Sequence, residues 1–284
     1  MKKTILVLMF SIFIFLSAGP CAAERNISIS SPGKAQIGQP FLVTASCSFD
    51  IENLKISWQG KECTLNEKGR GFSALIGTDL KNAKDGMNML VVSYFADGKS
   101  FEEKRKILLV KHEYPRENLK VSDDKLNPPA CLTERIKREA KMGREAIQTN
   151  TPGSAPLLPL LQPVSGRYTS VYGKSRYFNG EFRGRHGGVD IKASIGTPVK
   201  AAASGKVVLV GNFWFAGNCI YIDHGAGLIS FYGHMSKISK IKGENVQRGD
   251  VIGLSGKSGR VTGPHLHFSV SWRGEFFDPA PIME

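Results

Sequence analysis

The chain has 284 residues, a length that suffices for two domains. Its formal net charge is +13, from 38 Lys and Arg against 25 Asp and Glu, which favours contact with an anionic polymer. No nucleic-acid motif and no interleaving of basic and aromatic residues accompanies this charge, so we expect no nucleic-acid partner. A general surface charge without a specific partner is the alternative interpretation.

Residues 1–23 have the features of a secretory signal peptide. Two lysines precede an apolar run from Ile5 to Leu16, and small residues follow up to Ala23. The run is too short for a membrane span, so we predict cleavage after Ala23 and a mature chain without a stable membrane span. A lipid anchor on Cys21 is the alternative, although Pro20 fits the sequence ahead of such an anchor poorly.

Residues 24–113 have the pattern of short strands separated by turns. Apolar runs at Pro40–Ala45, Met89–Phe95 and Lys106–Val110 are separated by turn signals such as Asp97-Gly98. We predict a small β-sandwich-like domain with Trp58 in its core. Nothing in this region has the pattern of a catalytic site.

Four cysteines follow the predicted cleavage site: Cys47, Cys63, Cys131 and Cys219. If all were bridged, three pairings would be possible. Cys47 and Cys63 lie close together in one expected domain of an exported chain, so we predict a disulfide between them. Cys219 lies in an apolar run and is expected to be a buried thiol. The absence of a C-x-x-C spacing argues against a cysteine metal site.

Residues 114–154 are predicted to form a linker that contains a helix. Asn127, followed by two prolines, is typical of a helix start. Leu132 and later apolar residues recur at every fourth position up to about Ile147. We interpret this segment as an amphipathic helix that packs one apolar stripe against a domain.

Residues 155–284 form the second predicted domain. Strands are predicted, with no long helical pattern between them, at 198–202, 206–210, 220–222, 228–232, 251–254 and 267–270. An antiparallel β-sheet follows, and the whole chain is expected to be mainly β. Gly256-Lys257-Ser258 resembles the end of a phosphate-binding loop. It lacks the first glycine and a following helix, so we interpret it as a flexible loop.

Four of the six histidines lie in motifs that together suit a catalytic zinc site. His265 and His267 alternate along a predicted strand and so share one face, where one can bind metal while the other faces the attacking water. His186 and Asp190, in a His-x-x-x-Asp motif, add a nitrogen and an oxygen ligand. Three protein ligands with an open fourth position are typical of catalytic zinc. His234 lies between the two pairs.

The segment from about Pro163 to Met283 resembles the lysostaphin-type (LytM-type) zinc metallopeptidases of the bacterial cell wall. The matching motifs are Arg185–Asp190, Asp223–Gly225, Phe231–His234, Gly249–Gly253 and Gly259–Phe268. The resemblance implies that His186, Asp190 and His267 hold Zn²⁺ and that His234 and His265 are catalytic. It gives His224 no catalytic role, so we expect His224 to be structural. The strand-rich region ahead is similar to the accessory β-domain of some exported LytM-type enzymes.

The resemblance implies an exported zinc endopeptidase that hydrolyses peptide cross-links in peptidoglycan by metal-activated water. We expect His265 to take a proton from water and pass it to the leaving amine, and His234 to orient the water or bind the oxyanion. These two roles could be exchanged.

The expected partners are the peptide stems of peptidoglycan, for a monomer in the periplasm or outside the cell. No wall-anchoring repeat is evident, so diaminopimelate-type bridges are favoured over glycine bridges. One alternative is a catalytically inactive LytM-type domain that activates another cell-wall hydrolase, and a second is a basic envelope-binding protein. The complete set of ligand positions favours the active enzyme.

Overall fold

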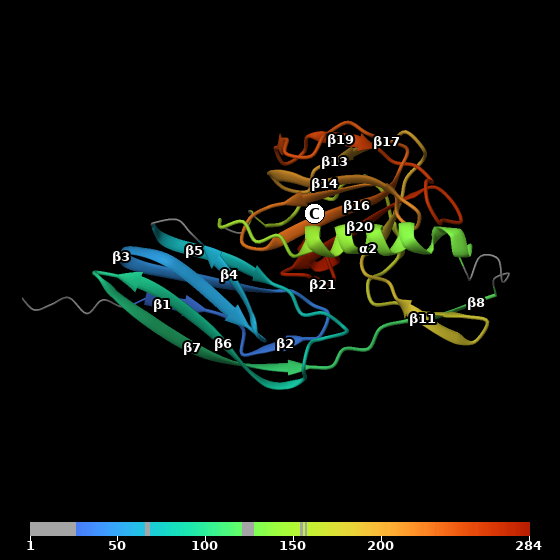
Figure 1. Cartoon of the computed structure of the whole chain (residues 1–284). Coiled ribbons are helices and arrows are strands. Elements are labelled where there is room, and N and C mark those ends of the chain that lie inside the picture. The colour runs from blue at the N-terminus through green and yellow to red at the C-terminus, as the bar shows by residue number, and fades with distance from the viewer. Residues whose placement is uncertain (1–26, 66–68, 121–127, 154–155, 157) are drawn as a thin grey trace, which may run out of the picture.

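The structure, a computed structural model, describes residues 27–65, 69–120, 128–153, 156 and 158–284. The predicted signal peptide, the alternative anchor at Cys21 and the predicted helix start at Asn127 lie outside these residues. The described part consists of two strand-rich units with one α-helix between them in sequence (Figure 1). The prediction of a mainly β chain is confirmed. No helix in the described part is long and apolar enough to cross a membrane.

The N-terminal unit is organised around one long strand, β3 (Phe41–Trp58). Its first half pairs with two strands and its second half with two others. Trp58 is 2% exposed and packs edge-on against Phe41, so its predicted place in the core is confirmed. The other strands of this unit are β1 (Ile27–Ser30), β2 (Lys34–Gln36), β4 (Lys61–Leu65), β5 (Gly69–Ile76), β6 (Gly86–Ala96) and β7 (Lys99–Val110).

Cys47 and Cys63 are both free thiols, so the predicted disulfide between them is wrong. Cys47 lies opposite Ile27 in the first half of β3, whereas Cys63 lies opposite Ile56 near the other end of the same strand. Between Cys47 and Ile56 the strand continues for about nine residues, roughly 30 Å when extended. A disulfide requires Cα atoms about 4.4–6.8 Å apart. Cys219 is buried, as predicted.

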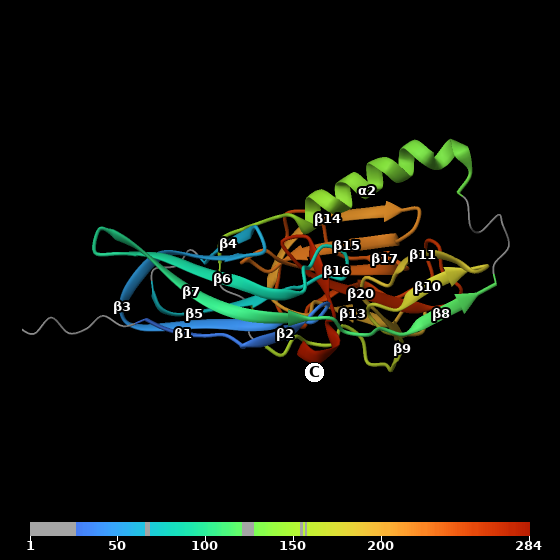
Figure 2. The same cartoon turned by 90° about the horizontal axis from the view of Figure 1, so that it is seen from below.

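The segment between the two units contains more structure than the predicted helix. A strand, β8 (Arg116–Leu119), pairs with β10 (Ser175–Phe178) of the C-terminal unit, and the sequence pattern did not indicate it. A short 3₁₀ turn, η1 (Ala130–Leu132), leads into α2 (Thr133–Ile147), which ends where predicted. Figure 2 shows α2 lying along one side of the C-terminal sheet, next to β14 (Gly205–Phe213).

The helix packs an apolar stripe on that sheet, as its periodicity predicts. Ala146 is buried in a cluster with Phe213 and Tyr221 of the sheet. Glu139 is also buried, and its carboxylate accepts hydrogen bonds from the backbone N–H of Trp214 at 2.7 Å and from Arg135 Nε at 2.6 Å. The helix therefore holds the turn after β14 by both apolar packing and a charged hydrogen bond.

The C-terminal unit is an eight-stranded antiparallel sheet with two smaller sheets beside it. Its central strands are buried, and β20 (His265–Trp272) brings Leu266, Phe268, Val270 and Trp272 into the core with no exposure. The predicted strands are all present. The remaining elements are β9 (Tyr168–Ser170), β11 (Glu181–Arg185), β12 (Val189–Lys192), β13 (Pro198–Lys200), β15 (Gly217–Asp223), β16 (Leu228–Met235), β17 (Lys237–Ile238), β18 (Asn245–Val246), β19 (Val251–Leu254), β21 (Glu275–Phe277) and η2 (Ala280–Ile282).

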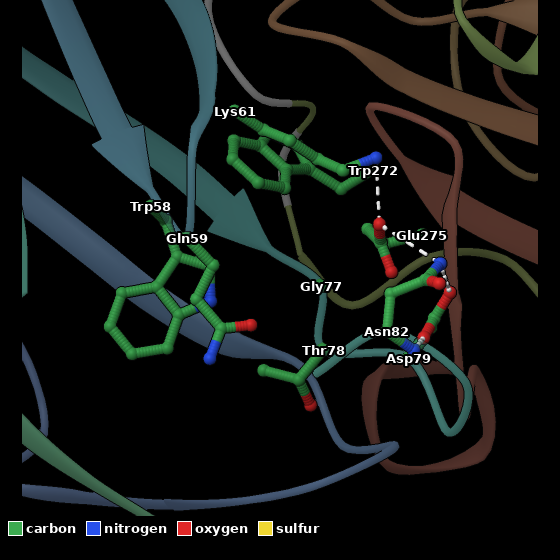
Figure 3. A pocket seen from close by; sticks show the side chains of 9 residues that line it. All are labelled: Trp58, Gln59, Lys61, Gly77, Thr78, Asp79, Asn82, Trp272 and Glu275. Carbon is green, nitrogen blue, oxygen red and sulfur yellow. Dashed lines mark hydrogen bonds and ion pairs between the residues drawn. The ribbon is translucent and has the colours of Figure 1, made fainter. Parts of the chain in front are cut away.

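A polar cluster joins the two units at the end of β20. Figure 3 shows Lys61 and Asn82 of the N-terminal unit reaching Glu275 of β21, beside a cavity of about 230 Å³. The Lys61 Nζ atom lies 2.6 Å from a Glu275 oxygen and donates to the Arg273 carbonyl at 2.8 Å. Burial and the neighbouring Asp79 raise the pKa of Glu275 to about 7. The cluster lies at the opposite end of β20 from His265.

Candidate metal centre and neighbouring histidines

Strand pairing brings the two halves of the predicted metal site together. In the antiparallel pair β12–β20, Asp190 lies opposite His267 and Lys192 lies opposite His265. The backbone just before β12 runs so close to β20 that a Cβ at Gly188 would lie 2.2 Å from the Phe268 carbonyl oxygen. Glycine at this position therefore permits the chain carrying His186 to approach β20.

The side chains of His186, Asp190 and His267 converge on one point. His186 Nε2 is 3.0 Å from Asp190 Oδ1 and 3.0 Å from His267 Nδ1, and His267 Nδ1 is 2.9 Å from Asp190 Oδ1. His186 is 4% exposed and Asp190 is 8% exposed. Two imidazole nitrogens and one carboxylate oxygen gathered in this way form a donor set that suits Zn²⁺.

Hydrogen bonds behind the cluster fix which ring nitrogen each histidine presents. His186 Nδ1 lies 2.9 Å from the Val171 carbonyl oxygen, a contact that requires the proton on Nδ1 and leaves the Nε2 lone pair for the cluster. His267 Nε2 lies 2.8 Å from the Ser269 hydroxyl, so that Nδ1 faces the cluster. Such outer contacts orient metal-binding histidines and raise their basicity.

The electrostatics favour the metal-binding protonation states of Asp190 and His267. Burial acts to raise the pKa of Asp190, but the hydrogen bonds with His186 and His267 outweigh it and hold that pKa well below its usual range. Burial lowers the pKa of His267 despite its contact with Asp190. An ionised carboxylate beside neutral imidazoles is the form that binds zinc.

His234 and His265 lie next to this cluster, with ring centroids 4.9 Å apart. His265 Nδ1 lies 2.9 Å from the Gly263 carbonyl oxygen and His234 Nδ1 lies 3.0 Å from the Ser258 carbonyl oxygen. Both rings therefore keep an Nε2 lone pair that can accept a proton. The His265 Nε2 atom is 3.6 Å from Asp190 Oδ1, so this ring faces the cluster directly.

The backbone at His234 is held in an unusual conformation. Its φ angle is +63°, in the left-handed region that residues other than glycine rarely adopt. Its N–H donates to the Ala216 carbonyl oxygen at 2.8 Å, which helps to hold it there. Burial, followed by the charges of His267 and His265, lowers the pKa of His234 to about 4, so the ring is neutral at neutral pH. Such local strain is common at functional sites.

His224 and Tyr232 lie outside the cluster. The His224 ring is buried between the Ser204 carbonyl oxygen, at 2.8 Å, and the Ser230 hydroxyl, at 2.7 Å. These contacts are consistent with the structural role expected for His224. The Tyr232 hydroxyl accepts the Ala202 N–H at 2.8 Å inside the core.

The groups that orient the histidines were not predicted from the sequence. Ser269 lies two residues after His267 on β20, so alternation alone could have placed it on the same face. Val171 and Ser258 act through backbone carbonyls, for which side-chain spacing gives no signal. Ser258 belongs to the segment interpreted as a flexible loop, yet its hydroxyl donates to the Met235 carbonyl oxygen at 2.6 Å and its carbonyl positions His234. The segment is a loop, as interpreted, and these two contacts tie Ser258 to the chain around His234.

Comparisons with known proteins identify the family of this chain. Residues 184–279 match the model of Peptidase family M23. A solved structure from Pseudomonas aeruginosa, described as a peptidase M23, is 31% identical with a TM-score of 0.64, over 84% of this chain and 91% of that chain. The chain therefore belongs to peptidase family M23, and it is a LytM-type peptidase by its motifs.

Two curated relatives match over the C-terminal unit. Peptidoglycan DD-endopeptidase ShyA of Vibrio cholerae is 49% identical over 89 residues, 31% of this chain and 21% of the relative. Lysostaphin of Staphylococcus simulans is 43% identical over 103 residues, 36% of this chain and 21% of the relative. The chain thus spans about a fifth of the length of these relatives.

Proposed function

We propose that the protein is an exported zinc endopeptidase that hydrolyses peptide cross-links in peptidoglycan. The observation that carries this proposal is the convergence of His186, Asp190 and His267, with His234 and His265 beside them. ShyA and lysostaphin match this chain over part of its length, and their names support a cell-wall substrate.

His186 Nε2, Asp190 Oδ1 and His267 Nδ1 would hold the metal. When bound, zinc supplies a Lewis acid that polarises the scissile carbonyl and makes water a stronger acid. His265 accepts the proton from water at Nε2 and returns it to the leaving amine, because its Nδ1 is fixed on the Gly263 carbonyl oxygen. The His265 Nε2 atom lies 3.6 Å from Asp190 Oδ1, so the ring faces the atoms that would hold the metal.

His234 orients the water. Its Nδ1–H is committed to the Ser258 carbonyl oxygen, so its Nε2 is an acceptor and not a donor. No aspartate or glutamate lies within ion-pair distance of the His234 ring in the described part of the chain, which makes it the poorer site for a proton. The different neighbours of the two rings support this division of labour between the two histidines.

A catalytically inactive domain that activates another hydrolase is the second candidate. Such a domain has no need of a full ligand set, or of two further histidines with fixed ring orientations. The completeness of the site here favours the active enzyme. The basic charge of the chain suits a substrate rich in carboxylates, in the periplasm or outside the cell.

The test is digestion of purified sacculi with the zinc-loaded protein, followed by mass spectrometry of the released fragments. We expect cross-linked muropeptides to be converted to monomers while the glycan strands remain intact. Cleaved glycan with intact bridges would show that the reaction class is wrong. No release of any kind, by a protein that binds zinc stoichiometrically, would favour the activator.

A further inference from the structure

Two arginines lie near the reacting groups, and the proposed mechanism uses neither. Arg176 of β10 places Nη2 3.4 Å from Asp190 Oδ2, on the side of the metal cluster. Arg260 lies two residues after Ser258, whose carbonyl oxygen holds His234. The Arg260 N–H donates to the Phe215 carbonyl oxygen at 3.0 Å. Arg176 thus lies beside the cluster and Arg260 close to the second histidine.

The two arginines differ in how their charge is balanced. Arg176 lies between two carboxylates, Asp190 and Glu117 of β8, the latter at 3.7 Å from Nε. Arg260 has no carboxylate within ion-pair distance among the described residues, and it is exposed. Partial burial, followed by the charge of Arg176, lowers the pKa of Arg260, so the two guanidinium groups are close enough to repel. In the described part of the chain, the Arg260 charge near the second histidine is therefore left without a counter-ion.

The Arg260 side chain is held ready for a ligand. Its guanidinium carbon lies 4.4 Å above the ring of Phe215, which itself packs edge-on against Trp214. Stacking uses the face of a guanidinium and leaves its edge of N–H donors open, the edge that binds a carboxylate with two parallel hydrogen bonds. Because the stack restricts the side chain beforehand, less conformational entropy is lost when an anion binds.

The chemistry of the cross-links suggests what that anion is. When a cross-link joins D-alanine to the side-chain amine of diaminopimelate, the carbon attached to the scissile nitrogen also bears a free carboxylate. A bridge of glycines has no carboxylate there. We propose that Arg260 binds the carboxylate beside the scissile amide and so selects diaminopimelate-type cross-links. This inference rests on the proposed endopeptidase function.

The experiment compares two synthetic cross-linked peptides that differ at one group. The carboxyl beside the scissile amide is free in one and amidated in the other, and the measured quantity is the ratio of their kcat/KM values. We expect the wild type to prefer the free acid by roughly 10- to 100-fold, the usual worth of a hydrogen bond to a charged group. Arg260→Gln should bring the ratio close to one, mainly by slowing cleavage of the free acid, and Arg260→Lys should give an intermediate ratio.

Lys257→Gln is the matched control, because Lys257 is an exposed cation three residues earlier in the same loop. It should keep the wild-type ratio, which would exclude a general effect of charge. A wild-type ratio near one would overturn the inference while leaving the proposed function intact. This outcome is measured on the wild type alone, so it does not depend on whether a variant folds. An equal loss on both peptides in Arg260→Gln would also overturn it. Failure of the wild type to cleave either peptide would instead count against the proposed function.

Discussion

Asp190 and His267 lie directly opposite each other on the antiparallel strands β12 and β20, with Oδ1 and Nδ1 2.9 Å apart. Opposite residues of an antiparallel pair point to the same face of the sheet, so the strand register alone brings two of the three candidate ligands together. A shift of the register by one residue would turn one of them to the other face. The sheet therefore fixes two of the three candidate ligands, and His186 comes from the connection just before β12.

We predict that the metal site depends on its outer contacts as well as on its ligands. His186→Ala, Asp190→Ala and His267→Ala should each abolish stoichiometric zinc. Ser269→Ala removes the hydroxyl behind His267 and should weaken zinc binding by about 10- to 100-fold. The measurement is zinc affinity by competition with a chelator.

Ser271→Ala is the control for Ser269→Ala. Ser271 lies on the same strand and is also buried, but its hydroxyl has no hydrogen-bond partner among the described residues. It should leave the zinc affinity unchanged. Equal affinities in the two serine variants would mean that the Ser269 contact does not orient His267.

Catalysis should be separable from metal binding. We predict that His265→Ala retains zinc while turnover of sacculi falls by about 10²- to 10⁴-fold, because a positioned proton acceptor is lost. His112→Ala, a change at an exposed histidine outside the site, should leave both quantities unchanged. Zinc content and rate are measured on the same preparation of each variant. Loss of zinc in His265→Ala would show that the roles of His265 and His267 have been exchanged.

The sequence predicted the site better than its surroundings. The alternation of His265 and His267 along β20 and the His-x-x-x-Asp motif depend on short-range geometry. The spacing of residues in the sequence predicts such geometry directly. The disulfide prediction failed because closeness in sequence was taken for closeness in space, while β3 carries Cys47 away from Cys63. Strand β8 was not predicted, because its pairing with β10 is a long-range contact that a short polar segment does not reveal. Likewise, the carbonyl groups that hold His234 and His265 have no side-chain signature.

Helix α2 should act on the site through the turn after β14. The buried Glu139 carboxylate accepts the Trp214 N–H at 2.7 Å, and Ala216 in the same turn accepts the His234 N–H at 2.8 Å. We predict that Glu139→Ala lowers the stability of the fold by about 1–3 kcal/mol, since it leaves the partly buried Trp214 N–H without its acceptor. Turnover should fall more than this loss of folded protein explains.

The measurements for Glu139→Ala are chemical denaturation and the rate per folded molecule. Glu134→Ala is the control, because Glu134 lies in the first turn of the same helix, is exposed and, among the residues that the structure describes, pairs only with Lys137, at 2.8 Å. It should change stability by less than about 0.5 kcal/mol. An unchanged rate per molecule in Glu139→Ala would show that the turn positions His234 without the helix.

The contact between the two units should weaken as the pH rises. The pKa of Glu275 is raised from its ordinary value to about 7, by burial and by the neighbouring Asp79. A raised pKa stabilises the fold below the ordinary value, near 4.5, and this contribution is lost as the pH rises through about 7. Asp79, whose pKa is lowered, acts in the opposite direction and only at acid pH.

We therefore predict that the Tm of the wild type falls more between pH 5 and pH 8 than the Tm of Glu275→Gln does. The expected difference is about 2–4 °C, which corresponds to about 1 kcal/mol in a domain of this size. The glutamine cannot ionise, so it removes the pH-dependent cost while keeping a group that can contact Lys61. Glu62→Gln, a change at the exposed residue next to Lys61 in β4, should follow the wild type. The measurement is a thermal scan of each zinc-loaded protein at several pH values. Parallel pH curves for the wild type and Glu275→Gln would show that Glu275 does not titrate between the units.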